Sequence, residues 1–270
     1  MLAALLLALP LPQETRPAPA SAPAPRDPAV DDLIELAKRF QFPGGPEIEI
    51  LDFEIRFDFV VRDEDGTHEF RARHLWRQPD RVLTTLDDDL TNVRTQSGFD
   101  GTTYWQKEAG KPTVRLEGRE FRRDREEIDE RIRLSADLAG AFSVPRLLAR
   151  VRKLRRAPDQ DRDGRKIAVL EGETDAFGPI RASEGEHVAI RLLFDSETGA
   201  LLEAVASPLL EGEGAPAPER FLFEAPKEVA GVRVPHRIQV YEGDARSPRF
   251  MITIREVQVN PGTSDESFRP

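Results

Sequence analysis

The stretch EIEILDFEIRFDFVV, at residues 47–61, decides the fold. From Phe53 to Phe59 every second side chain is aromatic or aliphatic, and the side chains between them are Glu, Arg and Asp. Successive side chains of a β-strand point to opposite faces of a sheet, so this period of two predicts one long strand with a dry face and a wet face. The alternation slips at Ile50 and Leu51, which predicts a β-bulge there.

Further strands are predicted on both sides of a central segment of different character. The stretch THEFRARHLWRQP continues the period of two, and short strands follow at about 81–87, 92–98 and 102–107. After residue 164 the alternation returns and continues almost to the end of the chain. Turn residues such as Asp-Gly and Thr-Gly separate these segments, which favours antiparallel hairpins over parallel crossovers.

Two segments predict helices. Residues 28–40 have apolar side chains at helical spacing and a proline in the first turn. Residues 119–156 have no strand alternation and predict a helical insertion, whose last helix begins after Ser143 and runs through VPRLLARVRKLRRA. The order helix, strands, helices, strands predicts an α+β fold: one strongly curved antiparallel sheet, an incomplete β-barrel, with helices covering its concave face. We expect a single domain over residues 29–270.

Composition excludes several classes of function. The chain has 270 residues, a formal net charge of −10 and no cysteine. The absence of cysteine excludes disulfides, thiolate metal sites, a cysteine nucleophile and a lipid anchor on an N-terminal cysteine. The acidic balance argues against nucleic acid as a partner, because that binding depends on clustered Lys and Arg.

The N-terminus has the features of an exported protein. Residues 1–11 form a short apolar run, and Ala18-Pro19-Ala20 fits the small-residue preference of a cleavage site. We expect a signal peptide at 1–20 and a Pro/Ala-rich tether at 21–28. The apolar run is too short to span a bilayer, so we expect a periplasmic or other envelope protein that is not integral to the membrane.

No catalytic signature stands out, and we expect neither an enzyme nor a cofactor. Nucleotide-binding, hydrolase and zinc motifs are absent from the sequence. A secreted hydrolase remains an alternative only if the fold brings together His74, His187 or His236 with carboxylates. Metal binding has one weak candidate, because DQDRDG matches the first half of a calcium loop but a leucine occupies the position of its last ligand. Its carboxylates are Asp159, Asp161 and Asp163.

The bulky side chains of the predicted strands gather on the dry faces. If the helices leave the concave side unfilled, an apolar groove remains that binds apolar molecules, whereas ordinary core packing is the alternative. The candidate groove residues are Phe53, Ile55, Phe57, Phe59, Phe70, Trp76 and Trp105. Arginines concentrate on the predicted insertion, either as a solvated helix face or as a contact for an anionic group or an acidic partner.

The order of short motifs resembles the periplasmic outer-membrane lipoprotein carrier family, the LolA-like proteins. The matching positions are Pro79, Asp100-Gly101 with Tyr104 and Trp105, Gly231-Val232 with Pro235, and Asn260 with Phe268 and Pro270. This resemblance implies an incomplete barrel with a helical lid over an apolar cavity that carries or senses lipid chains. The family carrier has an arginine directly before the proline that ties the lid to the barrel. Here Gln78 stands in that position, and Arg77 comes one residue earlier.

Three hypotheses follow. The first is a soluble exported protein that holds lipid or lipoprotein acyl chains in the groove, in lipoprotein trafficking. The second is a periplasmic regulatory module of the same fold that binds a membrane signalling partner. For a lid or partner contact the candidates are Arg77, Arg122, Arg123 and Arg125. The third is the secreted hydrolase, which has the least support in the sequence.

Overall fold

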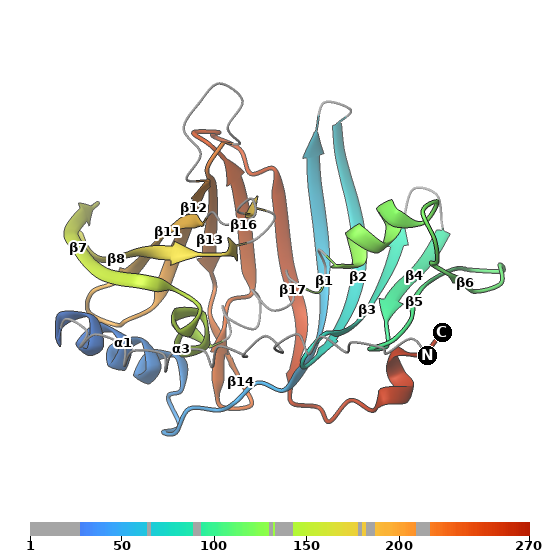
Figure 1. Ribbon diagram of the computed structural model, residues 1–270. Coiled ribbons are helices and arrows are strands. Elements are labelled where there is room, and N and C mark those ends of the chain that lie inside the picture. Colours follow the sequence, from blue (N-terminus) through green and yellow to red (C-terminus); the bar gives the residue numbers. More distant parts are fainter. Residues whose placement is uncertain are drawn as a thin grey trace, which may run out of the picture.

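A computed structural model describes residues 28–63, 66–88, 93–129, 132, 143–177, 180–181, 187–208 and 217–270. The expected signal peptide and nearly all of the expected tether lie outside these residues. Half of the described residues form one open antiparallel sheet of 13 strands (Figure 1). Its spatial order is β6-β5-β4-β3-β2-β1-β17-β16-β13-β12-β11-β8-β7.

The bounds of the strands agree closely with the predicted alternation in the first half of the sheet. The strands of this half are β1 (Asp52–Asp63), β2 (Gly66–Arg77), β3 (Arg81–Asp88), β4 (Val93–Phe99), β5 (Tyr104–Glu108) and β6 (Val114–Arg115). Those of the other half are β7 (Arg152–Arg162), β8 (Arg165–Thr174), β11 (Val188–Asp195), β12 (Leu201–Pro208), β13 (Glu219–Glu224), β16 (Arg237–Glu242) and β17 (Phe250–Val259). Two small hairpins complete the set: β9 (Ala176–Phe177) with β10 (Ile180–Arg181), and β14 (Lys227–Val229) with β15 (Val232–Val234).

Strand β1 lies at the centre of the sheet, between β2 and the late strand β17. The bulge predicted at Ile50 and Leu51 is wrong, because the strand begins only at Asp52. The backbone N–H of Leu51 instead donates to the side chain of Asn260 (2.8 Å), and its carbonyl accepts from the backbone N–H of Gln78 (2.9 Å), directly after the end of β2. The register shift lies further along, between Arg56 and Phe57 in the pairing with β17.

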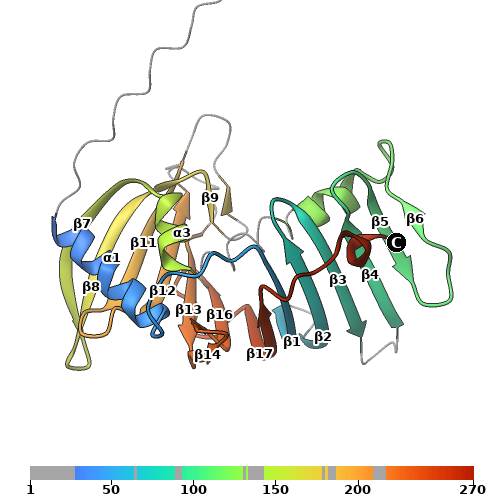
Figure 2. The ribbon, with the colours of Figure 1, turned by 90° about the horizontal axis from the view of Figure 1, so that it is seen from below.

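The α-helices lie on one face of the sheet, the concave face, whereas the short 3-10 helix η1 (Asp265–Phe268) lies on the opposite face (Figure 2). Helix α1 (Pro28–Gln41) and helix α3 (Val144–Ala149) cover the half that contains β8 and β11. A helix over residues 122–129 covers the other half, where Ile128 packs on Val82 and Phe99. The predicted helix at 28–40 is therefore confirmed, as is the α+β half-barrel with helices on its concave face.

The predicted helical insertion at 119–156 is wrong beyond Ala149. Residues 152–162 form β7, an edge strand that pairs with β8. Its side chains lack apolar alternation because they pair with carboxylates of β8 instead. Arg155 Nη2 lies 2.9 Å from Glu171, and Lys153 Nζ lies 2.9 Å from Glu173.

Candidate functional site

An apolar patch lies on the concave face across three central strands. The cross-strand register places Phe59 of β1 between Phe70 of β2 and Ile252 of β17. Phe57 precedes Phe59 on the same face, and Phe250 stacks on Phe59 with ring centroids 5.6 Å apart. All five side chains are half-buried. These residues, Phe57, Phe59, Phe70, Phe250 and Ile252, are called the concave patch below.

Three of the predicted groove residues belong to a closed core instead. Phe53 and Trp76 are 0% exposed and Ile55 is 1% exposed. They pack beneath the segment that follows α1 and the β14–β15 hairpin, which contribute side chains such as Phe42 and Val232. At this end of the strands ordinary core packing is therefore the correct interpretation.

Trp105 is not on the concave face at all, which corrects its assignment to the groove. The register pairs it with Gly98, and together with Leu75 and Leu83 it packs around Phe268 on the opposite face. A Cβ at Gly98 would lie 3.1 Å from the Trp105 ring and 2.6 Å from a β3 carbonyl, so the ring requires a glycine below it. The indole N–H of Trp105 donates to the carbonyl of Phe268 (2.9 Å).

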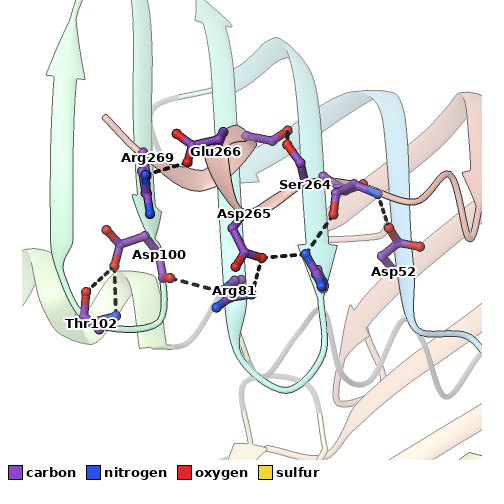
Figure 3. Close-up of polar contacts among 11 residues, drawn as sticks. Asp52, Arg81, Asp100, Thr102, Ser264, Asp265, Glu266 and Arg269 are labelled. Carbon is purple, nitrogen blue, oxygen red and sulfur yellow. Dashed lines mark hydrogen bonds and ion pairs between the residues drawn. The ribbon is translucent and has the colours of Figure 1, made fainter.

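The C-terminal segment is tied across this opposite face, where Asp265 meets Arg81 (Figure 3) and also pairs with Arg77. Arg77 Nη1 donates to the carboxylate of Asp265 (2.6 Å) and to the carbonyl of Thr263 (2.9 Å). Arg81 Nη1 donates to the same carboxylate (2.5 Å). Arg77 therefore anchors the C-terminus and does not contact the helices on the concave face, which corrects its assignment as a lid contact.

Sequence reasoning missed Arg146 of α3, which reaches from the helix to the strand end. Its Nη1 donates to the carbonyl of Ile50 (2.7 Å), and its guanidinium lies over the Trp76 ring, 5.2 Å from the centroid. With the Gln78 amide turned so that its oxygen faces Arg146, Gln78 accepts at 2.6 Å. Burial lowers the pKa of Arg146. One arginine thus connects α3 to the sheet.

No known family profile and no curated protein matches the sequence. Two solved structures share its architecture over most of their lengths. A domain from Vibrio parahaemolyticus named for outer membrane lipoprotein sorting has a TM-score of 0.51 at 12% identity, covering 88% of this chain and 97% of that one. A LolA superfamily protein from Nitrosomonas europaea has a TM-score of 0.52 at 11% identity, covering 89% of this chain and 97% of that one.

The protein has the LolA-like fold. This confirms the fold that the order of motifs around Pro79 and Gly231 indicates. The resemblance implied that an arginine on the strand, directly before the proline, would bind the helical lid. Here the arginine that connects helix and sheet is on the helix instead, at position 146. The strand end supplies Gln78 and a carbonyl as acceptors.

The half of the LolA-like sheet beneath α1 and α3 is filled with side chains. A cavity of about 60 Å³ remains there, between the ends of α1 and α3, the start of β12 and the β14–β15 hairpin. Pockets for small ligands have volumes of about 300–1,000 Å³. Among the described residues, the space between α1, α3 and the sheet is therefore too small for such a ligand.

The arginines of the helix at 122–129 divide into two kinds. Arg122 and Arg123 are exposed, and Arg123 lies 4.0 Å from Glu127. Arg125 instead lies over the Tyr104 ring, 4.9 Å from its centroid. The Tyr104 hydroxyl donates to Asp129 (2.6 Å), and burial together with that carboxylate raises the pKa of Tyr104 to about 12. Arg125 thus holds the helix on the sheet, whereas Arg122 and Arg123 extend into solvent.

The carboxylates of the half calcium loop do not converge. They lie along the β7–β8 hairpin, where Asp159 accepts from Arg156 (2.6 Å) and Asp161 accepts from the N–H of Gly164 (3.0 Å). Asp163 has a positive φ of 54° in the turn itself. Among the described residues no group of three or more His, Asp or Glu side chains is placed to hold a metal ion.

The histidines do not form a catalytic site with one another. His74 is buried on β2 and shares a hydrogen bond with Thr84 (2.9 Å). His187 lies beside Asp175 (3.2 Å), and His236 faces the carbonyl of Val234 (3.2 Å), where burial lowers the pKa of His236.

In the described part of the chain no helix is long and apolar enough to cross a membrane.

Proposed function

We propose that the protein is an exported binding protein that holds lipid acyl chains against the concave patch. The observation that carries the proposal is the half-buried row of Phe57, Phe59, Phe70, Phe250 and Ile252 on the face that bears the helices. Contiguous exposed apolar surface costs free energy in water, and an acyl chain that covers it recovers about 0.8 kcal/mol for each buried CH₂ group.

Binding of a fluorescent long-chain acyl methyl ester tests this proposal. The wild type should bind the ester saturably, and Phe59→Asp, which places a carboxylate at the centre of the patch, should weaken binding at least tenfold. Val114→Asp is the matched control, because Val114 is 44% exposed on the edge strand β6. No saturable binding by the wild type, or equal loss in both variants, would contradict the proposal.

A second candidate function is a regulatory module that binds an acidic segment of a membrane signalling partner. The exposed Arg122 and Arg123 favour it, because they are consecutive residues on a helix of an otherwise acidic protein. A pull-down from envelope extract should then recover a specific membrane protein, and the double variant R122E/R123E should lose it. The exposed Arg246 offers a control, R246E, that should retain the partner.

A further inference from the structure

The C-terminal segment, residues 261–270, lies on the opposite face of the sheet as a bound peptide does. The last main-chain hydrogen bond between the end of the chain and the sheet runs from the N–H of Asn260 to the carbonyl of Asp52 (2.9 Å). Among the described residues, the main-chain bonds beyond it stay within the segment, such as that from Ser267 to Ser264 (3.1 Å). The segment is therefore not a strand of the sheet, and side chains of the sheet hold it in place.

Three of these side chains hydrogen-bond to the main chain of the segment. Arg77 of β2 donates to the carbonyl of Thr263 (2.9 Å), and the indole N–H of Trp105 donates to the carbonyl of Phe268 (2.9 Å). The buried carboxylate of Asp52, at the start of β1, accepts from the N–H of Thr263 (2.5 Å). These contacts need no particular side chain on the segment, so they are available to another chain of the same backbone shape.

Two side chains of the segment contact the sheet, and they are three residues apart. The ring of Phe268 is 0% exposed and fills the apolar core around Trp105. The carboxylate of Asp265 accepts from Arg77 (2.6 Å) and from Arg81 (2.5 Å; Figure 3). The sheet thus holds an aspartate and, three positions later, a phenylalanine.

The residues between these two anchors do not take part in the contact. Among the described residues, Glu266 pairs with Arg269 of the same segment (2.5 Å), and its side chain is 72% exposed. The sheet side chains that hydrogen-bond to the segment include two arginines, Arg77 and Arg81, against the one carboxylate of Asp52. Without the segment, this surface would present an excess of positive charge beside an apolar socket, which favours an acidic peptide with an aromatic residue.

We propose that this surface is a peptide-binding site, that the C-terminal segment is its internal ligand, and that a partner with the pattern Asp-x-x-Phe in an acidic segment displaces it. Displacement leaves the sheet intact, because side chains alone hold the segment and the exposed Pro261 and Gly262 connect it to β17. The site lies on the face opposite to the concave patch, so this proposal is independent of acyl-chain binding.

A labelled synthetic peptide of residues 261–270, titrated against the full chain by fluorescence anisotropy, tests the proposal. The wild type should bind it weakly, because its own segment occupies the site. In full-length Asp265→Ala the internal segment loses its two bonds to the arginines, so the added peptide should bind about tenfold more tightly. Glu266→Ala is the matched control and should bind the peptide as the wild type does, because Glu266 pairs with Arg269 and not with the sheet.

A second peptide, which carries Phe268→Ala, should not bind. Binding of this second peptide, or equal affinity of the wild type and Asp265→Ala for the natural peptide, would overturn the proposal. So would the absence of saturable binding by Asp265→Ala when its circular dichroism matches that of the wild type.

Hydrogen exchange in the wild type decides the question if Asp265→Ala does not fold. Isotope-labelled protein is mixed with saturating unlabelled peptide, which should speed exchange at the amide of Thr263, because displacement separates it from Asp52. An unchanged exchange rate at Thr263 would overturn the proposal.

Discussion

Helix α1 rests directly on the turn between β11 and β12, and Gly199 makes that contact possible. A Cβ at Gly199 would lie 2.5 Å from the carbonyl carbon of Leu36 and 2.6 Å from the nitrogen of Ala37. Both atoms belong to the backbone of α1, so a rotamer change cannot relieve the overlap. The variant Gly199→Ala therefore forces the helix away from the sheet or the turn out of its conformation.

The size of this effect can be separated from that of backbone strain. Gly199 has φ +77° and Gly164, in the β7–β8 turn, has φ +76°, but a Cβ at Gly164 would meet nothing within 4 Å. A left-handed conformation costs an L-residue about 1–2 kcal/mol, and overpacking of a closed site adds about 1–3 kcal/mol. We expect Gly164→Ala to lower the free energy of unfolding by about 1–2 kcal/mol and Gly199→Ala by about 2–5 kcal/mol.

Urea unfolding followed by circular dichroism measures both values. The matched φ angles cancel the strain, so the difference between the two variants reports the contact of α1 with the turn. Equal destabilisation by the two substitutions would refute this account, because it would mean that α1 does not rest on Gly199.

Three further predictions concern other contacts. The Phe268 ring is 0% exposed and fills the core on the opposite face of the sheet, so Phe268→Ala should lower the free energy of unfolding by about 3–5 kcal/mol. The same variant should shift the fluorescence of Trp105 to the red. A loss below about 1 kcal/mol would contradict this. Arg146→Leu should speed amide hydrogen exchange in α3, and unchanged exchange would exclude Arg146 as its tie to the sheet. Burial of Asp195 opposes its ionisation, but hydrogen bonds from Thr198 and Arg165 outweigh the effect of burial and lower the pKa of Asp195. The ionised carboxylate therefore stabilises the fold at neutral pH, and this stability is lost as the pH falls through the lowered pKa. The Tm of Asp195→Asn should therefore fall less steeply below about pH 4 than that of the wild type, and parallel curves would oppose this.

Local pattern was sufficient to predict most of the sheet. The alternation from Phe53 to Phe59 predicts β1 and its dry face; the structure confirms the strand, and it buries that face fully only at Phe53 and Ile55. Edge strand β7 escaped prediction because its residues face water and the carboxylates of β8, so charge pairing replaces apolar alternation. The second partner strand of β1 is β17, roughly 200 residues away in the sequence, which no local pattern reveals.

The candidate site was less predictable for the same reason. Alternation shows that Trp105 points away from Tyr104, but not which of the two faces bears the helices. The register through Gly98 decides that. Phe250 joins the concave patch only because β17 pairs with β1, and Arg146 reaches Trp76 only after α3 folds back over the strand end. These contacts depend on tertiary arrangement, which a single sequence does not state.

Photocrosslinking maps where an acyl chain lies on the protein. A long-chain acyl methyl ester with a photoactivatable group near its terminal methyl is irradiated with the protein, and mass spectrometry locates the adducts. We predict adducts on β1, β2 and β17 at and beside Phe57, Phe59, Phe70 and Phe250, competed by unlabelled ester. Adducts on the opposite face around Trp105, or labelling that unlabelled ester does not reduce, would contradict the account.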